Sequence, residues 1–277
     1  PYYKDVCRVN IDTGELTTVV SSDHDYFAAT KKSLISLVGK AILGIDLDTV
    51  SGVSPNGEFV IVTRSRADEP PVSLLFDCQG REILEIEKAD ISSLPEDWQW
   101  PEPVKLKAAD GKTDIYGLVY RPSDFSPDKS YPVVASGHYG PDTPIVPKGS
   151  FSNEPFFGSF YFNELALAEL GFIVVQIDGR GTPYRDKAFM DESYGWAFSA
   201  SNMEDEIAGI RQLAERYIYM DLHRVGVICT VGGPGAVLGL LEHPDFYKVG
   251  VSILQHDSRL SPCTMFGDQF EGVLGPD

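Results

Sequence analysis

Four short apolar runs, separated by helix-length segments, constrain the fold of this chain more than any other feature. The runs cover residues 132–135, 172–177, 225–229 and 249–254. A strand that is apolar on both sides is typical of a parallel sheet whose two faces are covered by helices. The sequence therefore predicts an α/β domain with a parallel-rich sheet in the second half of the chain.

The segments around these runs carry helix and hairpin signals. One helix is predicted to begin at Asn163, a favourable cap residue, and to end before Gly171. Another begins with a Ser201-x-x-Glu204 capping box. Its apolar residues are spaced three and four apart, which predicts one buried face: Met203, Ile207, Ile210, Leu213 and Tyr217. A hairpin around Asp110-Gly111 is expected to precede the sheet.

The first hundred residues follow a different pattern, in which short strands alternate with glycine-containing turns. Turns are predicted at Asp12-Thr13-Gly14, Pro55-Asn56-Gly57 and Gln79-Gly80. Such recurrence is typical of β-propeller blades or of a sandwich. Residues 94–103 hold three prolines, which cannot donate in a strand ladder, so we expect this stretch to join the two halves.

Charge and composition exclude several classes of partner. With 23 basic and 41 acidic side chains, the net charge is −18, and a phosphate backbone would be repelled, so nucleic acid is not expected as a partner. The apolar runs are far shorter than a membrane span, and no stretch resembles a signal peptide. The four cysteines show no metal-ligand spacing, and we expect neither a metal nor another cofactor. Because the chain begins at Pro1, we expect the natural N-terminus to lie upstream, and the cell compartment stays open.

A glycine-rich turn follows the third apolar run. It consists of Cys229, Thr230, Val231, Gly232, Gly233, Pro234 and Gly235. Glycines permit the tight strand-to-helix turn of a nucleophile elbow, and the helix that follows offers backbone N–H groups to an oxyanion. However, the turn has no serine, the β-methyl group of Thr230 crowds a tight turn, and Cys229 is predicted to end the strand. From these residues alone, a turn without catalysis is an equal alternative.

Two other loops follow predicted strands, at the edge where parallel sheets form ligand crevices. Arg180 and Arg185 are candidates for binding a carboxylate or carbonyl group, although pairing with nearby acids to order the loop is the favoured alternative. His138 and Tyr139 are candidate oxyanion donors or acid–base groups, and an ordered aromatic loop is the equal alternative.

The second half resembles the catalytic domain of the prolyl oligopeptidase family of serine peptidases, especially its dipeptidyl-peptidase-IV-like and acylaminoacyl-peptidase-like members. Four stretches carry the resemblance in family order: residues 108–134, "GHYGP" at 137–141, "LALAELGFIVVQIDGRGT" at 165–182, and residues 221–252. The resemblance implies the first part of an α/β-hydrolase domain over residues 101–277. It also implies that residues 1–100 are the last blades of a β-propeller.

The family performs acyl transfer, in which a serine attacks the peptide carbonyl, a histidine shuttles the proton and an aspartate orients the histidine. A tyrosine and a backbone N–H hold the oxyanion. The position of the family's serine falls on Thr230 when it is counted back from "EHP", and on Val231 when it is counted forward from "RVG". The glycines of the family's elbow match Gly232 and Gly233. Tyr139, and after it His138, match the oxyanion tyrosine. The implied partners are a peptide substrate and further chain segments or a second copy of the chain.

Two departures from the family pattern leave the activity open. The elbow lacks its serine, and the chain ends at Asp277, before the family's aspartate and histidine. Two explanations fit these departures. The chain is a fragment of a serine peptidase, or it is an inactive pseudo-hydrolase that binds peptide or a protein partner. A modified serine between Thr230 and Val231, which one-letter code does not write, is a third explanation. As the sequence stands, we expect the 277-residue chain to be inactive by itself.

Overall fold

The computed structural model describes residues 2–28, 52–137, 144–151, 160–194, 202–229 and 235–253. The chain divides into two compact units. The first contains Pro1–Pro95 and Lys148–Pro155, and the second contains Glu96–Pro147 and Phe156–Asp277. The boundary at Pro95 lies within the predicted junction, whereas no sequence pattern predicted that residues 148–155 belong to the first unit.

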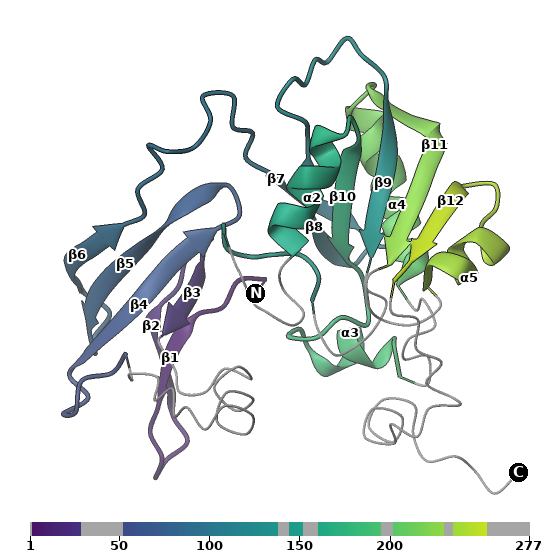
Figure 1. Ribbon diagram of the computed structural model, residues 1–277. Coiled ribbons are helices and arrows are strands. Elements are labelled where there is room, and N and C mark those ends of the chain that lie inside the picture. The colour runs from purple at the N-terminus through teal and green to yellow at the C-terminus, as the bar shows by residue number, and fades with distance from the viewer. Residues whose placement is uncertain are drawn as a thin grey trace, which may run out of the picture. The chain divides into compact units, whose positions relative to one another are not determined.

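The described part of the first unit contains two antiparallel sheets (Figure 1). Val6–Val9 (β1) and Leu16–Val20 (β2) form one, and Asp25–Ala28 (β3), Phe59–Arg66 (β4), Glu69–Asp77 (β5) and Glu82–Lys88 (β6) form the other, in chain order. The three predicted turns are confirmed, and Gly14, Gly57 and Gly80 adopt the positive φ angles that such turns require.

The described part of the second unit contains a six-stranded sheet with helices packed on it (Figure 1). Its elements are Glu102–Lys107 (β7), Asp114–Tyr120 (β8), Tyr131–Gly137 (β9), Phe160–Glu169 (α2), Ile173–Asp178 (β10), Lys187–Asp191 (α3), Met203–Arg216 (α4), Met220–Cys229 (β11), Gly235–Glu242 (α5) and Tyr247–Ser252 (β12). The strand order is β12-β11-β9-β10-β8-β7. Strands β9 to β12 are parallel to one another. Strand β8 runs antiparallel to both of its neighbours, β10 and β7. The predicted parallel-rich sheet and the hairpin before it are thus confirmed.

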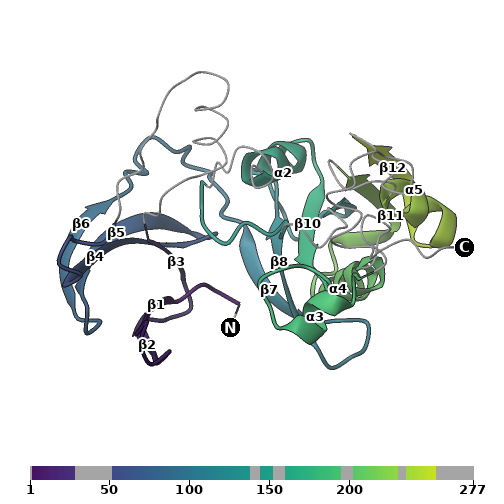
Figure 2. The same ribbon diagram turned by 90° about the horizontal axis from the view of Figure 1, so that it is seen from below.

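Helices cover both faces of this sheet. Helix α2 lies on one face and α4 on the opposite face (Figure 2). Helix α5 packs beside α4, because a Cβ atom on Gly239 would lie 3.1 Å from Cε of Met203. The predicted apolar face of α4 is confirmed, since Ile207, Ile210 and Leu213 are buried in the core with Met203. All six residues of β10 are buried, as expected for a strand that is covered on both sides.

Two predicted helix starts were wrong. Helix α2 begins at Phe160, so Asn163 lies inside the helix and does not cap it. Helix α4 begins at Met203, after an N-cap residue, Asn202, whose side chain makes no capping hydrogen bond. Glu204 is therefore the second helical residue, whereas a capping box requires it at the third. The three acidic residues of this first turn instead stabilise the helix N-terminus through the helix dipole.

We predict that Gly117→Ala destabilises the second unit more than Gly111→Ala does. A Cβ atom at Gly117 would lie 2.4 Å from the carbonyl oxygen of Gln176 in the adjacent strand, so β8 and β10 would have to separate locally. We expect a loss of about 3 kcal/mol. Gly111 has open space around it but a φ of 69°, so alanine there costs about 1 kcal/mol. Urea unfolding measures both values, and equal losses would contradict the pairing of β8 with β10.

Candidate active site

Strands β9 and β11 end side by side at the carboxyl edge of the sheet. They are parallel neighbours, and their register pairs Cys229 with Gly137. Neighbouring strands lie about 4.8 Å apart. The connections 138–143 and 230–234 therefore leave the sheet from directly paired residues, although almost a hundred positions separate them in the sequence.

Residues 230–234 link a strand to a helix, which is the context that a nucleophile elbow requires. Strand β11 ends at Cys229, and α5 begins at Gly235. Thr230, Val231, Gly232 and Gly233 themselves lie outside the described residues. Cys229 ends its strand as predicted and is fully buried in the apolar core, where a thiol is unreactive.

The oxyanion candidates His138 and Tyr139 also lie outside the described residues, but both ends of their connection are described. Beyond the connection, Oδ1 of Asp178 accepts hydrogen bonds from the backbone N–H groups of Ile145 at 2.8 Å and Val146 at 3.2 Å. Asp178 is buried and is the last residue of β10. The chain is therefore held to the carboxyl end of β10 as it leaves this connection.

The side chain of Arg180 is bound by acids of the chain itself. Its Nη2 and Nε atoms lie 2.9 Å and 3.0 Å from the two carboxylate oxygens of Asp205, and its backbone N–H donates to Asp205 at 2.8 Å. Asp110 and Glu192 lie 3.7 Å and 3.8 Å from Nη1. The hydrogen bonds that the Arg180 guanidinium donates to Asp205 raise its pKa. These contacts agree with the alternative in which Arg180 pairs with nearby acids and orders the loop after β10, instead of binding a ligand.

Glycines on both sides of Arg180 allow the loop to approach its neighbours closely. A Cβ atom on Gly179 would lie 2.8 Å from Cβ of Asn202, and one on Gly181 would lie 2.7 Å from Cβ of Ser193. The hydroxyl of Ser193 donates to the carbonyl oxygen of Gly181 at 3.0 Å. The glycines on both sides of Arg180 are therefore required by packing, independently of any ligand.

Arg185 is held by strand β8 and helix α3. Its Nη1 donates to the carbonyl oxygen of Asp114 at 3.1 Å. The guanidinium lies 4.3 Å from the ring centre of Phe189 and 5.7 Å from that of Tyr116, within the range of cation–π attraction. In this structure Arg185, like Arg180, fixes the loop that follows β10.

Sequence reasoning missed two buried carboxylates at this edge, Asp178 and Asp205. Asp205 also accepts a hydrogen bond of 2.8 Å from the backbone N–H of Ala109. It therefore joins α4 to the loop after β10 and to the turn between β7 and β8. Asp178 could have been found, because it is a charged residue at the end of an apolar strand. Asp205 gave no signal, since acids are common in the first turn of any helix.

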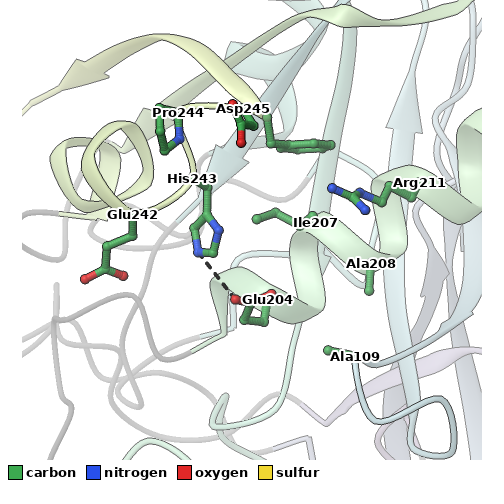
Figure 3. A pocket seen from close by; sticks show the side chains of 10 residues that line it. Ala109, Glu204, Ile207, Ala208, Arg211, Glu242, His243, Pro244 and Asp245 are labelled. Atoms are coloured by element: carbon green, nitrogen blue, oxygen red, sulfur yellow. Dashed lines mark ion pairs between the residues drawn. The ribbon is translucent and has the colours of Figure 1, made fainter.

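A separate pocket of about 360 Å³ lies between α4 and the connection from α5 to β12 (Figure 3). Glu204 and His243 point toward each other there, with 3.5 Å between Oε1 and Nε2. The guanidinium of Arg211 lies 5.5 Å from the ring centre of Phe246. Of the predicted site residues that the structure describes, neither Arg180 nor Arg185 lines this pocket, so we assign no step of the chemistry to it.

The described residues show neither a metal-binding cluster nor a membrane-spanning helix. They contain no group of three or more His, Cys, Asp or Glu side chains placed to hold a metal ion. Among the same residues, no helix is long and apolar enough to cross a membrane. Cys7 and Cys78 are free thiols.

We predict that Asp205→Asn destabilises the fold by about 3 kcal/mol, because it leaves Arg180 without its buried carboxylate and weakens the acceptor for two backbone N–H groups. Asp124→Asn is the matched control, since Asp124 is exposed and pairs only with Lys129 among the described residues. Chemical unfolding compares the two. A loss at Asp205 no larger than at Asp124 would contradict the role assigned to the buried carboxylate.

Comparison with known proteins identifies relatives of this chain. Residues 158–254 match the model of a family described as the prolyl oligopeptidase family. Human dipeptidyl peptidase 8 is 31% identical over 176 residues, which are 63% of this chain and 19% of that protein. Venom dipeptidyl peptidase 4 of Apis mellifera is 28% identical over 171 residues, which are 61% of this chain and 21% of that protein. The chain thus spans about a fifth of the length of these curated relatives.

A solved structure covers more of the chain. A Bacteroides ovatus protein, described as a dipeptidyl aminopeptidase IV, superposes on 96% of this chain with a TM-score of 0.69 and 22% sequence identity. The chain corresponds to 34% of that protein. At this identity the likeness concerns the fold, and together with the family match it shows that the second unit has an α/β-hydrolase fold.

Proposed function

Since residues 158–254 belong to the peptidase domain of the prolyl oligopeptidase family, we propose that the chain is part of a serine-type peptidase that hydrolyses peptide bonds in oligopeptides through an acyl-enzyme. The observation that supports this most is the pairing of Cys229 with Gly137. Because of this pairing, the connection with the nucleophile slot and the connection with the oxyanion candidates start from adjacent strand ends.

In this proposal the nucleophile lies at Thr230 or between Thr230 and Val231. Cys229 is set aside for this role because its side chain is fully buried. Gly232 and Gly233 supply the backbone freedom that the turn needs. The helix that begins at Gly235 supplies backbone N–H groups near the reacting carbonyl.

Tyr139 is our first candidate for the side-chain donor to the oxyanion, and His138 is the second. Electrostatic stabilisation of an oxyanion requires a donor whose position is fixed before the reaction. The hydrogen bonds of Asp178 to Ile145 and Val146 support this requirement, because they hold the segment that follows the two candidates.

In the complete peptidase of which this chain is a part, we predict that Tyr139→Phe lowers kcat for a chromogenic dipeptide amide by about 100-fold or more, with little change in KM. His138→Asn is the matched variant on the neighbouring residue and should have a smaller effect. A larger loss of kcat in His138→Asn would move the donor role to His138. If neither variant changes kcat, the connection 138–143 does not hold the oxyanion.

We propose that the first unit belongs to a β-propeller. A four-stranded antiparallel sheet in chain order is typical of a propeller blade. One face of this sheet packs into its own core, whereas Phe59, Ile61 and Leu84 on the other face are 40%, 43% and 55% exposed. The register aligns Ile61 with Leu75 and Leu75 with Leu84, so these side chains form a continuous apolar surface. Further blades would cover such a surface.

A pseudo-hydrolase that binds peptide or a protein partner is the second candidate, and the absence of serine from residues 229–235 favours it. The intact mass of the purified protein separates the two. A mass above that calculated from the sequence by a serine or modified serine residue supports the peptidase. The calculated mass, with peptide binding but no hydrolysis, supports the pseudo-hydrolase.

A further inference from the structure

A buried acid lies beside β9, just before the connection that carries His138 and Tyr139. Glu164 of α2 is 2% exposed, and its Oε1 accepts a hydrogen bond from the hydroxyl of Ser136 at 2.5 Å. Ser136 precedes Gly137, the last residue of β9. The contact therefore fixes the start of the same connection whose far end is held at Asp178.

No positive charge faces Glu164 among the described residues. From β8, the buried Tyr120 lies close to Glu164 and donates to Oε1 of Gln176 at 2.8 Å. Tyr161, on the same helix as Glu164, packs edge-on against Tyr120. Gln176 of β10 follows the register pair of Val175 with Ala135, which places it beside Ser136. Within this cluster, Oε2 of Glu164 and Nε2 of Gln176 have no hydrogen-bond partner in the described part of the chain.

Burial controls the protonation of this carboxyl group. Desolvation raises the pKa of Glu164 to about 7, while the hydrogen bond from Ser136 acts in the opposite direction. The neutral acid is tolerated in this interior. The ionised form would be a buried charge with a single hydroxyl donor and no counter-ion, which is costly. Water must then reach the carboxylate, and α2 must separate locally from the end of β9.

We propose that Glu164 is a positioning residue, which in its neutral form holds the end of β9 and loosens this strand end when its proton is lost to solvent. An effect of Glu164 on catalysis rests on the proposed function. The change in local opening of α2 and β9 with pH is independent of that function.

The sign of the effect follows from the pKa. The folded-state pKa of Glu164 lies above its usual value of 4.5, so the folded state favours the neutral acid. The stabilisation is fully present below about pH 4.5 and is lost as the pH rises to about 7. Local opening that exposes Glu164 should therefore increase about tenfold between pH 6 and pH 8.

Hydrogen–deuterium exchange of the purified protein tests this. Peptides that cover residues 131–137 and 160–169 are followed by mass spectrometry at pH 6 and pH 8, with correction for the intrinsic exchange rate. We expect the tenfold rise in the native protein and no rise in Glu164→Gln, which is neutral at both pH values. Glu215→Gln, which removes an exposed carboxylate from α4, should behave as the native protein. Equal exchange in the native protein and Glu164→Gln at pH 8 would overturn the proposal.

A second variant keeps the test decisive if Glu164→Gln does not fold. Ser136→Ala removes the hydrogen bond that lowers the pKa of Glu164, so the rise in exchange should move to higher pH. An unchanged midpoint would overturn the proposal.

Peptide hydrolysis by the complete peptidase, of which this chain is a part, separates this proposal from the proposed function. If both hold, kcat of the native protein falls from pH 6 to pH 8 relative to kcat of Glu164→Gln. Exchange that responds to pH without any hydrolysis would reject the peptidase and keep the role of Glu164. Hydrolysis without a pH-dependent change in exchange would reject the role of Glu164 alone.

Discussion

The buried carboxylate of Asp205 joins three segments that are far apart in the sequence. It accepts hydrogen bonds from the backbone N–H groups of Ala109 and Arg180 and from the Arg180 guanidinium. A buried charge is tolerated only where it is paired and hydrogen-bonded. The segments that hold Ala109 and Arg180 must therefore lie against Asp205. Residues 179 and 181 must be glycines, because a side chain at 179 would collide with Asn202 and Asp205 and one at 181 would collide with Ser193. Asp205 thus ties the loop after β10 to α4, while Arg185 holds the same loop to β8 and α3.

The register of the central strands then brings separate connections together. Parallel pairing of β9 with β11 starts the connections 138–143 and 230–234 from neighbouring positions. Two further buried carboxylates hold the first of these connections, Glu164 before it and Asp178 after it. They hold it differently, because Asp178 accepts from two backbone N–H groups and Glu164 from one hydroxyl. The start of the connection is therefore the end that responds to protonation.

Features set by local chemistry could be predicted from the sequence. The apolar runs predicted the parallel strands, and the glycine turns predicted the hairpins, since both depend on a few adjacent residues. The start of α2 at Phe160 was missed, because the position of a helix cap depends on how the chain enters the fold. The partners of Arg180 were left as two alternatives, since only the fold brings Asp205 to it. The placement of Ser150, whose N–H donates to the carbonyl oxygen of Arg66 at 3.1 Å, carries no local signal.

Labelling with a fluorophosphonate probe is the most direct measurement of whether a nucleophile lies at the end of β11. The complete protein that contains this chain is purified, treated with the probe, digested, and analysed by mass spectrometry for the position of any adduct. A nucleophile at Thr230, or between Thr230 and Val231, predicts an adduct within residues 227–234. A protein that is shown to be folded and takes up no probe would contradict the peptidase, and the strand ends at Gly137 and Cys229 would then mark a surface for binding alone.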